Sequence, residues 1–132
     1  MRLRQICFVS NDLENALSSF SFITGSDVCF RDEGVSYFGL KNGLLEVDGN
    51  FLEVVSPFKP NTTAERFLTR MNSDAGYMLI FECEDADTYR KKAVDLKIRD
   101  IWSSDLNNGV KATHYHPKDI GGLIISVDSM NN

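Results

Sequence analysis

A carboxylate in the middle of an apolar strand is the first feature of this sequence that could do chemistry. Residues 51–57, FLEVVSP, have the composition of a strand inside a sheet, and Glu53 stands within the run. Desolvating a carboxylate is costly unless a partner compensates for the lost water. Two interpretations are open: either Glu53 points to a wet side of its strand, or it faces a site that needs a carboxylate.

The only two histidines of the chain form the second candidate group. His114 and His116 are two residues apart, so on a strand both would point to the same side, and metal sites use this spacing. In one interpretation His116 begins the His-Pro-Lys-Asp turn and His114 is partly exposed. In the others the pair contacts a ligand or a metal ion.

The three cysteines indicate neither a disulfide framework nor a zinc site. Cys7, Cys29 and Cys83 are odd in number and lack CxxC spacing. We expect each of them to be a small buried apolar residue.

Length and charge narrow the classes of partner. The 132 residues suffice for one compact domain, and 42% of them are hydrophobic. A net charge of −5 repels phosphate backbones and anionic lipid, so neither nucleic acid nor a membrane is an expected partner. The apolar stretch at the N-terminus is too short for a signal peptide and no segment is long enough to span a bilayer, so a cytoplasmic location is expected.

An internal repeat organises the elements that must position these residues. RQICFVSNDLENAL at 4–17 lies over YMLIFECEDADTYR at 77–90 with a shift of 73 residues, and each run is a strand followed by an acidic helix start. The same shift lays Phe51, Leu52 and Val54 over apolar residues near the C-terminus. Each half is therefore expected to hold a strand, a helix and then three strands.

The first half has one amphipathic helix and several short strands. The apolar face of the helix is formed by Leu13, Ala16, Leu17, Phe20 and Ile23, with Gly25 as its C-terminal cap. Strands are expected near 27–31, 35–40 and 51–56, with a further short strand over 44–47 and turns at 41–43 and 48–50.

The second half repeats this order after a structured connector. Its helix uses Ala86, Tyr89, Ala93 and Leu96, and its strands are expected near 98–103, 110–115 and 122–128. In the connector, Thr62 and Glu65 form a capping-box pattern that opens a short helix.

This repeated module resembles the vicinal oxygen chelate superfamily, which includes glyoxalase I, methylmalonyl-CoA epimerase, extradiol dioxygenases and bleomycin-resistance proteins. The resemblance covers nearly the whole chain. FLEVVSP is similar to the glutamate strand that ends the first module, and HPKDIGGLIISVD at 116–128 is similar to the closing hairpin of the epimerase branch.

The resemblance implies an α+β fold of two tandem βαβββ modules whose curled mixed sheets enclose a cavity. It places module one at 1–57, a connector with a short helix at 58–75 and module two at 76–132, all within a single domain. It also implies a homodimer that binds a small molecule.

In this superfamily four residues typically hold a divalent metal ion. By resemblance these positions fall on Gln5, Glu53, Met78 and Ser126, and the repeat pairs Gln5 with Met78 and Glu53 with Ser126. Serine and a thioether are poor ligands for hard ions, so a metal would retain only Gln5 and Glu53. The predicted metal site is incomplete, and the cofactor stays open.

Strand alternation favours the second interpretation of Glu53. Phe51, Glu53 and Val55 share one side of their strand, and Gln5 and Cys7 take the equivalent side of the first strand. Glu53 is therefore predicted to face the cavity.

Two functions follow from the resemblance. The first is a glyoxalase-like lyase or isomerase acting next to a carbonyl, with Glu53 as base and His114 or His116 donating to the enolate oxygen. The second is a metal-free small-molecule binding protein of the bleomycin-resistance type. Gln5, Met78, His114, His116 and Ser126 are the predicted ligand-binding residues in either case, and Phe51, Tyr77, Trp102 and Tyr115 are the aromatic candidates near the cavity.

Overall fold

The computed structural model of the chain describes residues 1–105 and 109–130. Their contacts form two compact units, which we name the N-terminal unit (residues 6–77) and the C-terminal unit (residues 1–5 with 78–132). The boundary at Tyr77 lies close to the expected start of module two. The expected single domain with a separate connector stays a prediction.

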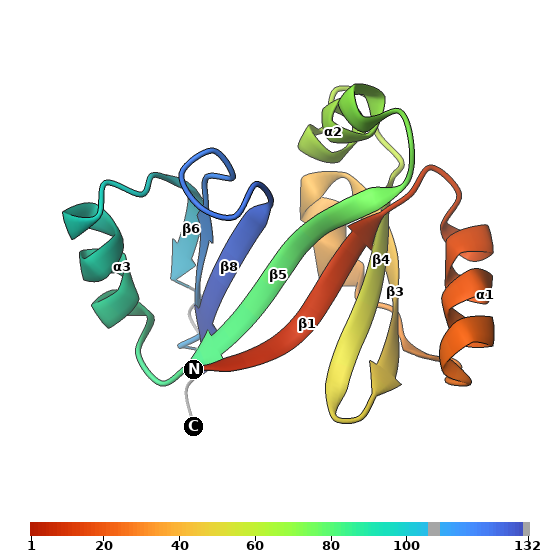
Figure 1. Cartoon of the computed structure of the whole chain (residues 1–132), viewed down its shortest axis with the longest axis horizontal. Coiled ribbons are helices and arrows are strands. Elements are labelled where there is room, and N and C mark those ends of the chain that lie inside the picture. Colours follow the sequence, from red (N-terminus) through yellow and green to blue (C-terminus); the bar gives the residue numbers. More distant parts are fainter. Residues whose placement is uncertain (106–108, 131–132) are drawn as a thin grey trace. The chain divides into compact units, whose positions relative to one another are not determined.

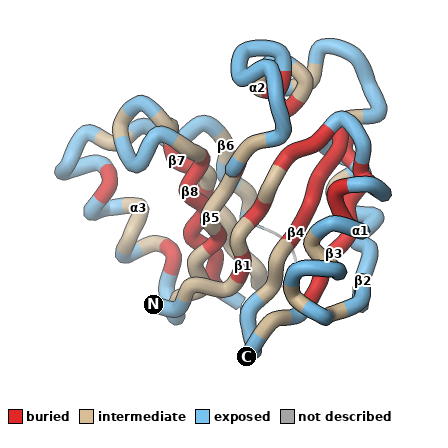
Figure 2. The backbone as a smooth tube through the Cα atoms, turned by 45° about the vertical axis from the view of Figure 1, so that its right-hand side comes forward, coloured by how far each residue is buried: buried red, intermediate tan, exposed pale blue. Residues whose placement is uncertain are grey.

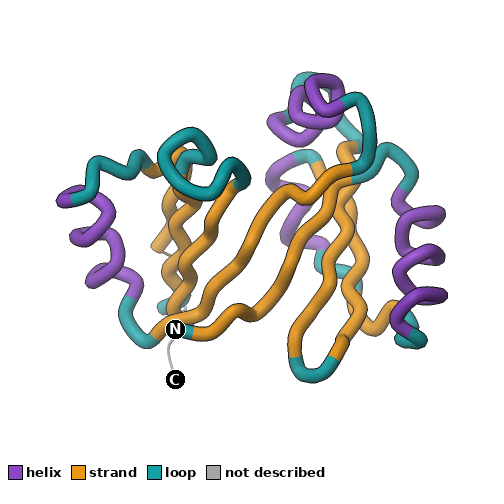
Figure 3. Tube along the Cα trace, viewed as in Figure 1, coloured by secondary structure: helices purple, strands orange, loops and turns teal. Residues whose placement is uncertain are grey.

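The element order is that of an α+β fold with a repeated βαβββ module. The first module contains β1 (Arg2–Val9), α1 (Leu13–Thr24), β2 (Val28–Phe30), a 3₁₀ helix η1 (Glu33–Phe38), β3 (Leu40–Val47) and β4 (Asn50–Pro57). Helix α2 (Thr63–Met71) follows, and the second module contains β5 (Ala75–Cys83), α3 (Ala86–Asp95), β6 (Asp100–Asp105), β7 (Lys111–Tyr115) and β8 (Ile124–Ser129). The repeat predicted from the sequence is confirmed, and Figure 3 shows the helices and strands along the chain.

Side-chain caps start the three α-helices where the sequence predicts them. Asp12, Thr62 and Asp85 each accept a hydrogen bond from a backbone N–H of the first helical turn. Gly25 ends α1 with a φ of 74°, a left-handed conformation that favours glycine. Local sequence alone fixes these boundaries.

The N-terminal unit packs its sheet on α1. Its strand order is β2-β3-β4-β1, and β3 and β4 form an antiparallel hairpin closed at Asp48 and Gly49. Helix α1 runs along β3 and β4 (Figure 1), where Leu17 packs with the fully buried Leu45 and Val54. Successive residues of a strand point to opposite faces, so alternate residues of β4 turn away from α1.

Two sequence expectations in this unit are wrong. Instead of a strand over 35–40 the chain forms η1, because the Asp32 side chain caps its start and Gly39 ends it with a φ of 73°. Residues 41–43 form no turn but lie inside β3. The glycine there, Gly43, serves close packing, since a Cβ at this position would lie 2.6 Å from Leu17 Cδ1.

The C-terminal unit packs a mixed sheet on α3. Its strand order is β5-β8-β7-β6, in which β5 and β8 are parallel and the other neighbours are antiparallel. Ala93 of α3 forms a buried cluster with Tyr115, Ile125 and Val127. Tyr115 therefore packs against α3.

Burial is greatest in the central strands of each unit, where it includes residues of both sheet faces. The middle of β4 and much of β8 are buried, while the helices expose their outer sides (Figure 2). Cys7 is buried as expected, but Cys29 is exposed. None of the helices within residues 1–105 and 109–130 is long and apolar enough to cross a membrane.

Gly43→Ala tests the contact between α1 and β3. The added methyl group would collide with the buried Leu17, so we expect the free energy of unfolding to fall by about 1–3 kcal/mol. Urea denaturation measures this change. Gly76→Ala is the control, because a Cβ there has no neighbour within 4 Å; an equal loss in both variants would contradict the packing argument.

Candidate functional site

Glu53 lies on β4 on the face that turns away from α1. Its neighbour Val54 packs with α1, so alternation sends Glu53 to the other face. The residue is only 5% exposed. Glu53 is thus buried on the side of β4 that lies opposite Val54, so it does not point to a wet face of its strand; that it faces a cavity stays a prediction.

Asn42 on β3 holds the Glu53 carboxylate. Its Nδ2 donates to Glu53 Oε2 at 2.5 Å, and its Oδ1 accepts the Asp32 backbone N–H at 2.8 Å. Asn42 is paired with Val55, two residues from Glu53, so the two side chains are diagonal neighbours on one face. Sequence reasoning missed Asn42 because the Lys-Asn-Gly run reads as a turn.

Cys7 of β1 is a second polar neighbour of Glu53. Burial raises the pKa of the Cys7 thiol well above its ordinary value, and the charge of Glu53 and a hydrogen bond to it add to the rise. Near pH 7 the thiol therefore stays protonated and can donate to the carboxylate. Burial also raises the pKa of Tyr77 to about 12, so this phenol is neutral too.

The C-terminal unit carries a polar cluster of its own on the face opposite α3. Ser126 of β8 is paired with His114 of β7 and with Ile80 of β5. Its hydroxyl donates to Asp128 Oδ1 at 2.6 Å, and Arg4 Nη2 donates to Asp128 Oδ2 at 2.9 Å. Ser126, the predicted metal ligand of the final strand, is thus hydrogen-bonded to Asp128, which forms an ion pair with Arg4.

The two histidines have different environments. The His114 ring lies against Trp102, with 4.6 Å between the ring centroids, and burial lowers the pKa of His114 while the Asp128 charge opposes that shift. His116 follows β7, and its Nδ1 accepts the Lys118 backbone N–H at 3.1 Å. His116 therefore starts the turn, as one of the interpretations expected.

The remaining predicted residues are also placed in the C-terminal unit. Met78 of β5 is paired with Ile124 of β8 and is partly buried. Gln5 is buried, and its Oε1 accepts Arg4 Nε–H at 3.3 Å. Within this unit His114 and Ser126 are direct neighbours, whereas Asn42 and Cys7, which contact Glu53, belong to the N-terminal unit.

These residues do not fit a divalent metal ion. Met78 offers a thioether, and the Ser126 hydroxyl donates its proton to Asp128. Within the described ranges, 1–105 and 109–130, no three His, Cys, Asp or Glu side chains are grouped to hold a metal. Among the described residues, the four positions that the resemblance assigns to a metal ion therefore form no complete ligand set.

Solved structures of other proteins have the same fold as this chain. A variant of the Streptomyces coelicolor methylmalonyl-CoA epimerase in complex with 2-nitronate-propionyl-CoA matches with a TM-score of 0.84 and 17% identity, over 98% of this chain and 94% of that one. The chain has the epimerase fold. The resemblance to this branch that the sequence indicated is confirmed at the level of the fold.

Further structures agree with this fold. The methylmalonyl-CoA epimerase from Mycobacterium tuberculosis matches with a TM-score of 0.83 and 18% identity, over 99% of this chain and 89% of that one. A hypothetical protein from Bacillus halodurans matches with a TM-score of 0.85 and 11% identity, over 99% and 95%. No protein-family model and no curated protein matches the sequence.

Replacing Asn42 tests its hydrogen bond to the buried Glu53 carboxylate. Asn42→Leu removes a donor from a buried carboxylate and an acceptor from Asp32, so we expect a loss of about 1–3 kcal/mol in unfolding free energy. In a double-mutant cycle with Glu53→Leu, the double variant should lose less than the sum of the single losses. Strict additivity in chemical denaturation would contradict the contact.

The pKa of His114 gives a second test. The folded chain disfavours its protonated form, so the imidazole should titrate below its ordinary value of 6.5, and its contribution to stability should fall as pH drops below 6.5. Asp128→Asn removes the opposing charge and should lower the NMR midpoint further. A His116→Gln variant assigns the two imidazole signals, and a midpoint that rises in Asp128→Asn would refute this electrostatic description.

Proposed function

We propose that this chain is an isomerase or lyase that removes a proton next to the carbonyl of a small molecule, with Glu53 as the base. The observation that carries the proposal is the buried Glu53 carboxylate, held by Asn42 on the sheet face that α1 leaves uncovered. A fixed carboxylate shielded from water can accept a carbon-bound proton in a defined direction. The epimerase fold supports the same reaction class by analogy.

The reaction in this proposal has two halves. Glu53 takes the proton from the carbon next to the carbonyl, and the C–H electron pair moves into an enolate. A proton delivered from water to the opposite face of that carbon completes an isomerisation, and Glu53 then passes its own proton to water; return to the original face only regenerates the substrate.

Acyl-CoA thioesters are the first substrates to test. One similar structure is a methylmalonyl-CoA epimerase in complex with methylmalonyl-CoA, and another contains 2-nitronate-propionyl-CoA. A nitronate is planar and anionic, as an enolate is, so tight binding of this compound would report a site shaped for the intermediate. We also propose that the chain forms a homodimer and binds its small-molecule substrate in a cavity.

Deuterium exchange at the carbon next to the carbonyl measures the proposed step directly. In D₂O the wild-type chain should exchange the 2-hydrogen of methylmalonyl-CoA, and Glu53→Gln should slow that exchange by about 10²-fold or more. Glu46→Gln, an exposed carboxylate on the neighbouring strand, is the matched control and should keep the wild-type rate. Unchanged exchange in Glu53→Gln would exclude Glu53 as the base.

The alternative is a metal-free binding protein, which the engaged Ser126 hydroxyl and the missing ligand set favour. In this case 2-nitronate-propionyl-CoA or another small molecule binds with a measurable Kd by calorimetry, yet the thioester exchanges no deuterium. Loss of that binding in Glu53→Ala would then assign the carboxylate to ligand anchoring.

A further inference from the structure

Cys7 lies beside Glu53 on the neighbouring strand, and this placement follows from the strand register. β1 and β4 are adjacent and run in the same direction (Figure 1), and the Ser10 N–H donates to the Val55 carbonyl at 3.0 Å. In a parallel pair an N–H bonds to the carbonyl of the residue before its partner, so Ser10 stands opposite Ser56. Three residues earlier on both strands, Cys7 stands opposite Glu53.

The second half of the chain has the same register. There β5 and β8 are parallel, and Ile80 is paired with Ser126. The 73-residue repeat lays these two positions over Cys7 and Glu53. Two separate observations therefore pair the thiol with the carboxylate.

Side-chain alternation puts both groups on the same face of the sheet. Phe8 contacts Phe20 of α1, with 4.7 Å between the ring centroids, so Cys7 points to the face opposite α1. Cys7 is only 1% exposed, and its thiol donates a hydrogen bond to Glu53. Burial and the Glu53 charge raise the pKa of the Cys7 thiol well above its ordinary value, so the donated proton is retained near pH 7.

A second acceptor is within reach of the thiol, and charge decides between the two. The backbone carbonyl oxygen of Phe8 lies 3.7 Å from Cys7 Sγ. A hydrogen bond to a charged acceptor is stronger than one between neutral groups, so the carboxylate of Glu53 is the favoured partner.

Glu53 thus has one donor on each flanking strand. Asn42 Nδ2 on β3 donates to Oε2 at 2.5 Å, and Cys7 donates from β1. Donors on two rigid strands restrict the rotation of the carboxylate more than one donor would. A base that must meet a carbon-bound proton from one direction needs this restriction, because a small misplacement slows the reaction strongly.

We propose that Cys7 is a positioning residue for the base: its thiol hydrogen-bonds to the Glu53 carboxylate from β1 and holds it in the orientation that accepts the proton. This inference rests on the proposed function, in which Glu53 removes a proton next to a carbonyl. The thiol itself takes no part in the proton transfer.

Exchange kinetics separate positioning from structural support. With methylmalonyl-CoA in D₂O, Cys7→Ala should lower kcat for exchange by about 10-fold and change KM by less than about twofold, because Cys7 contacts the base and not the substrate. Cys7→Ser restores a donor and should regain most of the lost kcat. A purely structural role predicts the reverse order, because an unpaired hydroxyl costs more in an apolar place than a methyl group.

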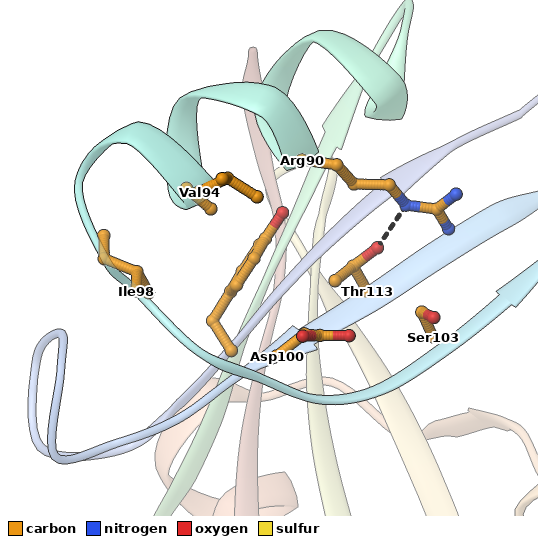
Figure 4. Close-up of a pocket in the computed structure, with 8 residues that line it drawn as sticks. Arg90, Val94, Ile98, Asp100, Ser103 and Thr113 are labelled. Atoms are coloured by element: carbon orange, nitrogen blue, oxygen red, sulfur yellow. Dashed lines mark hydrogen bonds between the residues drawn. The ribbon is translucent and has the colours of Figure 1, made fainter.

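Thr113→Val is the matched control for the loss of a buried hydrogen bond. Thr113 is 2% exposed, and its Oγ1 accepts Arg90 Nε–H at 2.7 Å beside α3 in the other unit (Figure 4). This variant should lose stability in urea denaturation and keep the wild-type kcat. A wild-type kcat in Cys7→Ala, or a Cys7→Ser variant no faster than Cys7→Ala, would overturn the proposal.

The S–H stretching band in the infrared spectrum tests the contact without turnover, and it decides if Cys7→Ala does not fold. In a Cys29→Ser and Cys83→Ser background Cys7 is the only thiol. Glu53→Gln removes the charged acceptor and should move the band to higher frequency. An unchanged band would overturn the proposal at the contact itself. A shifted band with no deuterium exchange in the wild-type chain would show instead that the proposed function fails, and the positioning role with it.

Discussion

One-sided packing is the constraint on which both units depend. In each unit a single helix covers one face of the sheet, and the residues that meet it alternate with residues that cannot. Leu45 and Val54 face α1 in the N-terminal unit, and Ile125 and Val127 cluster with α3 in the C-terminal unit. These helix-facing positions form an apolar cluster in each unit, and the opposite faces carry buried polar residues beside buried apolar ones such as Val55 and Ile124.

The polar clusters on the sheet faces opposite α1 and α3 are networks of hydrogen bonds. Asn42 connects Glu53 to the backbone at Asp32, and Asp128 joins Ser126 to Arg4. A buried network of this kind is stable only when its members are satisfied. In the second network, the position that the resemblance assigns to a carboxylate ligand holds the Ser126 hydroxyl, which donates to Asp128.

The epimerase fold persists in this chain at 17–18% identity to the epimerases because its determinants are few and local. Helix caps at Asp12 and Asp85 and the two-residue turn at Asp48 set the element boundaries. Apolar residues of suitable volume on the helix-facing side then suffice for packing. The other side can change its chemistry without changing the architecture, and for this reason the fold alone does not assign a substrate.

The sequence by itself determined the repeat, the helix starts and the side of the strand on which Glu53 lies. Each of these depends on a local period or on a capping side chain within a few residues, which a single sequence displays. The 73-residue shift between the halves added the order of the strands.

Only the tertiary structure showed which residues contact one another. Gly43 reads as a turn residue until the close approach of Leu17 is known, and Asn42 meets Glu53 only through the register of β3 and β4. These contacts join residues that are distant in the chain, and a linear pattern carries no distance between separate elements, so packing and register had to supply it.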